Sequence, residues 1–148
     1  MNESELKAVV EIIQHYFSQQ SGKPAEMGTP FLADAHALPV SDYTGVIGIS
    51  GERKGSVYFT APTDLLRQLL ICCGEPNTSA ENLADLAGEI GNTIAGNARK
   101  IFGPNFLISV PVVVKGREQV ISMPKHVKSY VIPFRWYDHG ASLVVSVV

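Results

Sequence analysis

One long stretch, residues 80–102, constrains the fold more than any other part of the sequence. On a helix, at about 100° per residue, it gathers its large apolar side chains on a single face, which predicts an amphipathic helix with one buried stripe. Ser79 is a good N-cap for this helix, and Gly103 followed by Pro104 ends it. The buried stripe comprises Leu83, Leu86, Ala87, Ile90, Ile94, Ala98 and Ile101.

Strands are predicted on both sides of this helix, in consecutive groups. Residues 43–50 and 56–60 flank a loop with two glycines, which is typical of a hairpin. Two further helices are expected at about residues 4–18 and 63–73. Strands that come in runs rather than alternating with helices favour an α+β fold, with a largely antiparallel sheet packed against amphipathic helices. The other expected strands are residues 31–38, 107–114, 119–121, 127–134 and 141–148.

Composition narrows the class of protein. The 148 residues fit one domain spanning 1–148, and 45% hydrophobic with 18% charged residues supply a core rather than a disordered chain. A net charge of −2 without a basic cluster argues against a nucleic-acid partner. No charged leader with a long apolar run begins the sequence, and no stretch approaches the roughly 20 apolar residues that span a membrane. We therefore expect a cytoplasmic protein without a membrane partner.

Neither the cysteines nor the histidines form a pattern typical of a reactive site. Cys72 and Cys73 are adjacent, with Cα atoms about 3.8 Å apart, which is shorter than disulfides usually allow, so we expect reduced thiols that pack on a helix. The histidines are scattered and lack a His-Glu-x-x-His motif. No metal site is predicted from them. The four histidines are His15, His36, His126 and His139.

The polar face of the 80–102 helix holds the candidate functional residues. Glu89 and Asn92 are three residues apart, so both side chains project from one patch. Gly88 and Gly96 also fall on this side, although a glycine inside a helix costs about 1 kcal/mol relative to alanine. Bare backbone there predicts a docking face that another surface can approach closely. The alternative is an ordinary solvated helix face. The set comprises Asp85, Gly88, Glu89, Asn92, Gly96 and Arg99.

Two other residues of this helix have structural interpretations. Gly91 can be a packing contact with a strand. Asn97 falls on the apolar side, so we expect a hydrogen-bonded residue of the core rather than a catalytic one.

The run from Asp85 to Ala98, DLAGEIGNTIAGNA, resembles the catalytic helix of the CheC/CheX/FliY phosphatases. Their motif is Asp or Ser, three residues, Glu, two residues, Asn, and Asp85, Glu89 and Asn92 match it. Gly96, four residues after Asn92, is similar to the CheX branch. Ile108-Ser109-Val110-Pro111, with Gly116 further on, resembles the strand that follows this helix in CheX. CheC-like proteins carry two copies of the motif, whereas this chain carries one, which favours CheX.

The resemblance implies a function. The family's substrate is the aspartyl phosphate of a CheY-like receiver domain, which supplies its own Mg²⁺, lysine and hydroxyl, so no cofactor of this chain's own is expected. Asn92 would orient the attacking water, and Glu89 would pair with the receiver lysine. Asp85 would add a peripheral contact, and Gly88 and Gly91 would permit close approach of the helix. A water held in line with the breaking bond is what this chemistry requires.

The sequence is also compatible with two other functions. Asp85 and Glu89 could form a two-carboxylate hydrolase, although their spacing along one exposed helix gives no cleft. A CheX-like module could also bind a receiver, or another signalling protein, without hydrolysing anything.

A homodimer joined through the β-rich part of the chain is also predicted. The strand at residues 141–148 is apolar on both alternating sets, so it needs cover on two faces or a central position. At an exposed edge it would pair with another chain. CheX, which the chain resembles, dimerises through its sheet. The alternative is a monomer in which this strand lies inside its own sheet.

Overall fold

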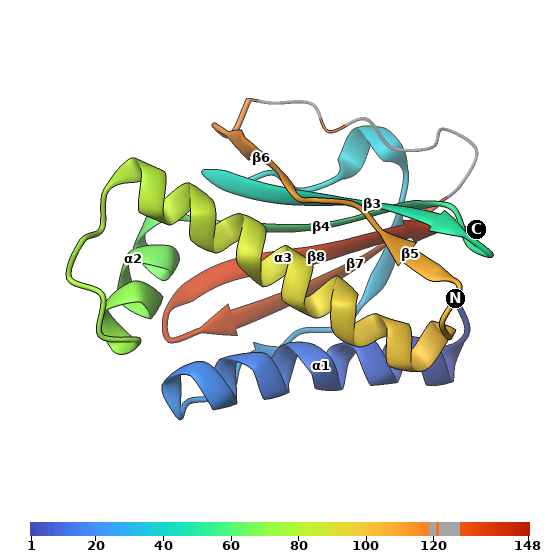
Figure 1. The fold of residues 1–148 in the computed structure, drawn as a ribbon, viewed down its shortest axis with the longest axis horizontal. Helices are drawn as coiled ribbons and strands as arrows, with labels where there is room; N and C mark the ends of the chain where they lie inside the picture. The colour runs from blue at the N-terminus through green and yellow to red at the C-terminus, as the bar shows by residue number, and fades with distance from the viewer. Residues whose placement is uncertain (119–120, 122–127) are drawn as a thin grey trace.

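The computed structural model describes residues 1–118, 121 and 128–148. Helices α1 and α3 lie along one face of an antiparallel sheet, and α2 lies at one end of it (Figure 1). The expected α+β fold, with an antiparallel sheet packed against amphipathic helices, is confirmed. The elements are α1 (Glu3–Ser21), β1 (Glu26–Met27), β2 (Phe31–Ala33), η1 (Ala35–Ala37), β3 (Tyr43–Gly51), β4 (Gly55–Ala61), α2 (Thr63–Cys72), α3 (Ala80–Phe102), β5 (Phe106–Ile108), β6 (Val112–Lys115), β7 (Ser129–Trp136) and β8 (His139–Val147).

The ends of both long helices are set by local sequence. The Asn2 side chain accepts a hydrogen bond from the Glu5 backbone N–H at 2.8 Å, and the Glu5 carboxylate accepts one from the Asn2 N–H at 2.9 Å. This capping box starts α1. The Ser79 hydroxyl accepts from the Asn82 N–H at 3.3 Å and starts α3, which ends at Gly103. The sequence therefore fixes where the helix of the candidate site begins and ends.

The sheet has its longest strands at its centre. In the described residues its order is β1-β7-β8-β4-β3-β5, with β2 also paired to β7 and β6 also paired to β3. The face turned towards α1 and α3 carries the main core, and burying one large apolar side chain in it stabilises the fold by about 1.5–3 kcal/mol. Among its fully buried members are Phe17 from α1, Ile47 from β3, Phe59 from β4, Leu143 from β8, and Ile90 and Ile94 from α3.

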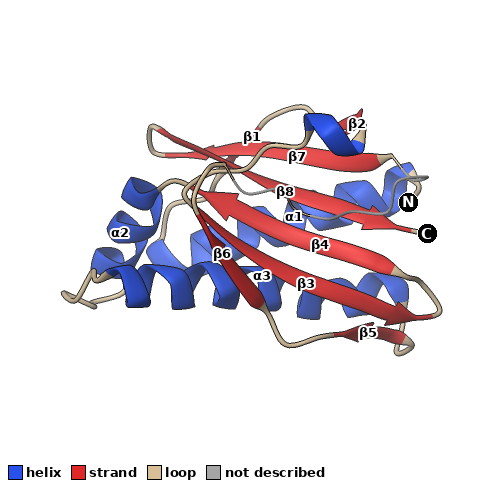
Figure 2. Cartoon of the chain, turned by 90° about the horizontal axis from the view of Figure 1, so that it is seen from above, coloured by secondary structure: helices blue, strands red, loops and turns tan. Residues whose placement is uncertain are grey.

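The opposite face of the sheet has a smaller core. Tyr58, Val131 and Val144 form a buried cluster, against which Leu38 packs from the segment between β2 and β3. Figure 2 shows this segment crossing the face that the helices leave open. The Tyr58 hydroxyl donates to the Pro39 carbonyl at 2.7 Å. The sheet is thus covered on both faces.

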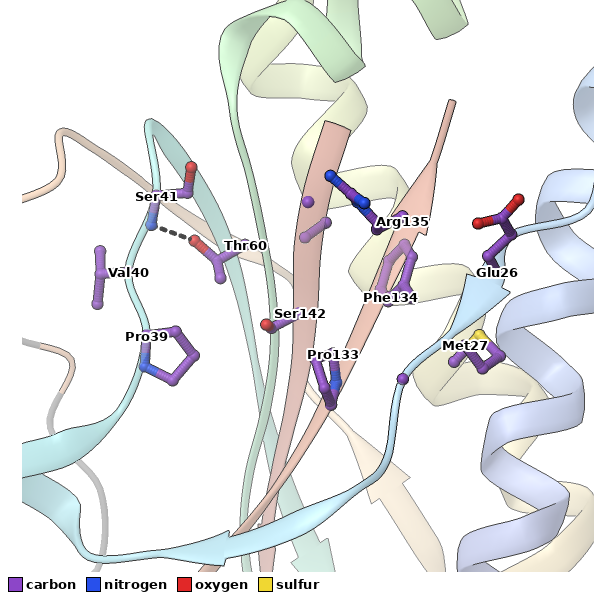
Figure 3. A pocket seen from close by; sticks show the side chains of 13 residues that line it. Glu26, Met27, Pro39, Val40, Ser41, Thr60, Pro133, Phe134, Arg135 and Ser142 are labelled. Carbon is purple, nitrogen blue, oxygen red and sulfur yellow. Dashed lines mark hydrogen bonds between the residues drawn. The ribbon is translucent and has the colours of Figure 1, made fainter. Parts of the chain in front are cut away.

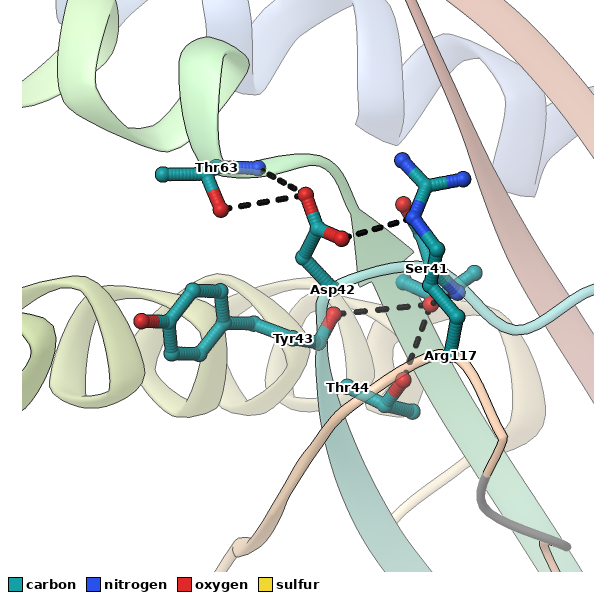
Figure 4. Close-up of polar contacts among 7 residues, drawn as sticks. Ser41, Asp42, Tyr43, Thr44, Thr63 and Arg117 are labelled. Carbon is teal, nitrogen blue, oxygen red and sulfur yellow. Dashed lines mark hydrogen bonds and ion pairs between the residues drawn. The ribbon is translucent and has the colours of Figure 1, made fainter.

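Asp42 joins three parts of the chain beside the start of β3 (Figure 4). Its carboxylate accepts hydrogen bonds from the Thr63 backbone N–H at 2.8 Å and the Thr63 hydroxyl at 3.0 Å, and it pairs with Arg117 at 2.7 Å. An acidic group suits the N-terminus of a helix such as α2. The Arg117 hydrogen bond, followed by those from Thr63, lowers the pKa of Asp42. Asp42 therefore anchors α2 to the sheet.

Several predicted elements differ from the structure. The strand predicted at 31–38 ends at Ala33 and is followed by the turn of η1. The strand predicted at 107–114 is two strands, β5 and β6, because the chain leaves the ladder before Pro111, which has no N–H to donate. β1, inside a segment expected to be a loop, pairs with β7. The strand predicted at 119–121 falls largely outside the described residues.

The C-terminal strand lies inside its own sheet. β8 pairs with β7 on one side and β4 on the other. A central position satisfies its need for cover, so the exposed edge that was one motive for predicting a dimer is absent from this strand.

None of the helices in the described residues combines the length and the apolar character needed to cross a membrane.

Candidate functional site

The predicted polar face of α3 is exposed. Asp85, Glu89 and Asn92 are all exposed. The residues between Asp85 and Asn92, apart from Glu89, are buried. Positions four and three residues apart bring the three side chains into one row along the helix. The structure therefore brings together the three residues that match the motif.

A close contact between α3 and β3 holds this row in place. A Cβ atom at Gly45 would lie 2.5 Å from the Ala87 carbonyl oxygen, and one at Gly91 would lie 3.2 Å from the Gly45 carbonyl oxygen. Gly45 leaves no room for a side chain at this approach, and Gly91 leaves room for a Cβ atom only if the neighbouring backbone shifts by a few tenths of an ångström. The packing interpretation of Gly91 is confirmed. The contact leaves the opposite side of α3 facing outward.

The prediction that Gly88 lies on a bare polar side is wrong. Gly88 is buried, and a Cβ atom there would lie 3.0 Å from Val113 Cγ2 and 3.5 Å from Pro111 Cβ. The chain after β5 crosses over this side of the helix, which a helical periodicity cannot reveal. Gly96 is more open, with Ile108 Cδ1 at 3.9 Å as its nearest neighbour. Gly88 therefore seats the β5–β6 connection against α3.

That connection is itself fixed to the sheet. The Gly48 backbone N–H donates to the Ser109 hydroxyl at 2.8 Å, and the Ser109 N–H donates to the Gly48 carbonyl at 2.9 Å. The Ser109 hydroxyl also donates to the Val110 carbonyl at 3.1 Å. Ser109 thus carries the chain past the break in the ladder and sets Pro111 on Gly88.

Tyr16 of α1 is a neighbour of the site that sequence reasoning missed. Its side chain is buried. Burial, and after it the negative charge of Glu89, raises the pKa of the Tyr16 hydroxyl well above its ordinary value. The group therefore stays a neutral hydroxyl beside Glu89 at physiological pH. A signal for this pair was not available in the sequence, because the two residues lie far apart along the chain.

Two other predictions concern nearby side chains. The Asn97 NH₂ group donates to the Thr93 carbonyl at 3.0 Å, so the predicted hydrogen bond is confirmed, but Asn97 is half-buried rather than part of the core. Cys72 and Cys73 are free thiols, although they are exposed rather than packed in the core. Burial, followed by the charges of Cys72 and Glu89, raises the pKa of the Cys73 thiol. A raised pKa makes this thiol a poorer nucleophile at neutral pH.

A cavity of about 480 Å³ lies away from this row, on the face of the sheet opposite α3 (Figure 3). Pro39 and Pro133 contribute to its apolar lining, and Arg135 and Glu26 stand at its rim. None of the motif residues reaches it. The described residues also contain no group of three or more His, Cys, Asp or Glu side chains that could hold a metal ion; His126 lies outside those residues.

The geometry limits the chemistry of the row. Asp85, Glu89 and Asn92 are exposed on the surface of a helix, and none of them lines the cavities found among residues 1–118, 121 and 128–148. An amide can both donate to and accept from a water, and a carboxylate can pair with a cation. Such groups become an active site only when a second molecule closes over them. The row is therefore suited to a macromolecular substrate.

The model of the family described as chemotaxis phosphatase CheX matches residues 43–135, which include all of α3. The search of curated proteins gives no match.

Solved structures share the whole fold. A CheC-like superfamily protein from Shewanella sp. PV-4 is similar with a TM-score of 0.86 and 23% identity, over 100% of this chain and 99% of that one. The chemotaxis protein CheX from Vibrio vulnificus gives 0.84 and 22%, over 98% and 99%. CheX in a CheX–CheY–BeF₃–Mg²⁺ complex from Borrelia burgdorferi gives 0.80 and 19%, over 97% of each chain.

The packing at Gly88 predicts a loss of stability on substitution. Gly88→Leu would push side-chain atoms into Val113 and Pro111, and overpacking of this kind costs about 1–3 kcal/mol. We expect a lower urea midpoint for this variant. The matched control is Gly96→Ala in the same helix, where the nearest atom at 3.9 Å leaves room; it should gain up to about 1 kcal/mol from helix propensity. Unchanged stability of Gly88→Leu would show that the contact yields freely.

Proposed function

The chain belongs to the CheX family of chemotaxis phosphatases, whose model matches residues 43–135, and on that premise we propose that it hydrolyses the aspartyl phosphate of a CheY-like receiver domain. The observation that carries the proposal is the exposed row on α3, with Asn92 and Glu89 on a convex surface that a partner can cover. Residues 1–148 would act as one CheX-like domain, in the cytoplasm.

Asn92 is proposed to supply the one group that a receiver lacks. Hydrolysis of an acyl phosphate needs a water placed in line with the phosphorus–oxygen bond to the aspartate. The side-chain oxygen of Asn92 would accept a hydrogen bond from that water, and its NH₂ group would donate towards a phosphoryl oxygen. Attack of the water on phosphorus breaks the acyl phosphate bond and yields inorganic phosphate and the free carboxylate of the receiver. A new covalent intermediate is not needed.

Glu89 is proposed to set the register of the partner. It lies one helical turn before Asn92, so a lysine of the receiver that pairs with it would place the phosphoryl group over the amide. Asp85, one turn earlier, would contact the rim of the receiver. Gly88 would act indirectly, by holding the β5–β6 connection below the level of the row.

Metal chemistry belongs to the partner in this proposal. The Borrelia burgdorferi complex contains CheX, CheY, BeF₃ and Mg²⁺, which supports a receiver that brings its own cation. This chain would then need neither a metal ion nor a cofactor.

Asn92→Ala tests the chemistry. We expect receiver dephosphorylation to fall about 100-fold or more, because the water is no longer held in line, while the melting temperature stays unchanged at an exposed position. The measurement is loss of radiolabelled phosphate from the receiver. Asn105→Ala, an exposed asparagine in the turn after α3, is the control and should retain activity. Hydrolysis at the wild-type rate by Asn92→Ala would rule the mechanism out. If the wild-type protein does not change the rate at which the receiver loses phosphate, the chain can only be a binding module.

Glu89→Lys tests docking. Reversal of this charge should raise the dissociation constant for the activated receiver about tenfold or more, which corresponds to about 1.4 kcal/mol. Glu52→Lys makes the same charge change in the exposed β3–β4 hairpin and should leave affinity unchanged. Titration calorimetry with both variants decides the matter. Equal affinities would assign Glu89 to an ordinary solvated surface.

A homodimer joined through the sheet is the second part of the proposal. The edge formed by β5 and β6 exposes three large apolar side chains: Leu107 is 50% exposed, Val112 63% and Val110 83%. An edge strand with apolar side chains and unpaired backbone groups pairs readily with another chain. The exposed row on α3 would remain accessible on each subunit.

Light scattering tests the dimer. The wild-type protein at micromolar concentration should have twice the 16.0 kDa mass of the chain, and Val112→Asp should give the single-chain mass, because a carboxylate cannot be buried unpaired at the edge. Leu32→Asp at the opposite edge, also exposed, is the control and should stay dimeric. A monomeric wild-type protein excludes a stable dimer.

A further inference from the structure

A groove of about 280 Å³ runs between α1 and α3, beside the exposed row. Tyr16 joins the two features, because it lines the groove and its hydroxyl is close enough to Glu89 for the carboxylate charge to raise the pKa of the phenol. Thr93, one turn after Glu89, lines the groove from the other helix. The groove therefore begins at Thr93, the residue that follows Asn92 on α3. Its lining comprises Ile12, His15, Tyr16, Gln19, Gln20, Thr93, Asn97 and Lys100.

The row on α3 is too narrow to hold a protein partner alone. A specific interface covers about 800 Å² on each partner, whereas one helix with its side chains is only about 10–12 Å wide. A receiver-sized domain has a radius of gyration of about 13 Å. Lys100 lies eight residues after Asn92, or about 12 Å along the helix. A domain seated on Asn92 therefore also covers surface beside α3, and the groove is the concave part of that surface.

The charge and polarity of the groove identify what it would bind. Lys100 has no ion-pair partner among the residues that the structure describes. Exposed amides line α1 at Gln19 and Gln20. The Asn97 NH₂ group is bound to the Thr93 carbonyl, which leaves the amide oxygen to accept a further hydrogen bond. Lys100 and these amides can bind a polar loop that carries a carboxylate, and Ile12 and Tyr16 can contact its apolar atoms.

The exposed side of α3 also changes sign at Asn92. Asp85 and Glu89 come before it, and Arg99 and Lys100 come after it. A receiver carries a lysine on one side of its phosphoryl group, and it needs carboxylates to hold Mg²⁺. Charge complementarity then favours one orientation, with the lysine over Glu89 and the acidic side over Lys100.

We propose that the α1–α3 groove is the second half of the receiver docking surface, and that it takes a polar, carboxylate-bearing loop of the receiver next to Lys100. This inference rests on the proposed function. It assigns recognition to α1 and the C-terminal half of α3, and it leaves the chemistry to Asn92.

The experiment uses a CheY-type receiver from the same organism, loaded with beryllofluoride and Mg²⁺, and measures its dissociation constant by titration. Lys100→Glu should raise that constant about tenfold, and Lys100→Arg should restore it to within about twofold, because the charge is kept. Gln19→Trp changes an exposed residue on α1 and should also raise it about tenfold, by filling the groove. The control is Lys54→Glu, the same charge reversal in the exposed β3–β4 hairpin, which should leave affinity unchanged. Melting temperatures report on folding.

Each outcome decides between the proposals. Wild-type affinity of both Lys100→Glu and Gln19→Trp overturns the groove, and so does a loss confined to Lys100→Glu, because charge would then act without an occupied groove. Weaker binding of both variants, together with full dephosphorylation by Asn92→Ala, supports the groove and overturns the proposed chemistry. A wild-type protein that does not bind the receiver overturns both.

Discussion

The contact between the backbones of α3 and β3 is the constraint on which the candidate site depends. Gly45 on the strand and Gly91 on the helix remove the side chains that would hold the two elements apart. A glycine inside a helix is costly, and here the cost is offset by the close packing that it permits. Because this contact fixes one side of α3, the opposite side faces outward at Asp85, Glu89 and Asn92. The exposure of Glu89 and Asn92 follows from the contact that the other side of α3 makes with β3.

The second consequence is that the candidate site lies on an exposed surface. An enzyme for a small molecule surrounds its substrate, whereas Asp85, Glu89 and Asn92 are exposed on the surface of α3. In the proposed mechanism, the partner would hold the reacting bond and this chain would add one oriented amide. Rigid supports matter more than a pocket in such an arrangement. The Ser109–Gly48 hydrogen bonds and the Pro111 contact at Gly88 supply that support on one side, and α1 supplies it on the other.

The sequence predicted those features of α3 that depend only on residues close together along the chain. The span of α3, its caps and its exposed row follow from a period of 3.6 residues and from Ser79 and Gly103, and the structure agrees with them. Features that depend on distant segments were not predictable. The cover over Gly88 comes from residues more than twenty positions later, and the proximity of Tyr16 to Glu89 joins two different helices. The central position of β8 depends on the order of all the strands, which its own apolar pattern allows but does not specify.

The order of charges on α3 has two explanations that the structure can separate. Acidic residues in the first turn and basic residues in the last turn stabilise any helix by opposing its macrodipole, and Glu81, Arg99 and Lys100 gain this stabilisation whatever else they contact. The effect falls off within one turn of each end. Glu89 and Asn92 lie in the middle of α3, two or more turns from either end, so the macrodipole does not account for them. Asparagine also has a low helix propensity, and within the described residues the Asn92 side chain makes no hydrogen bond that would offset this loss of helix stability. The positions of Glu89 and Asn92 at the centre of an exposed helix are consistent with the contacts proposed for them with a partner.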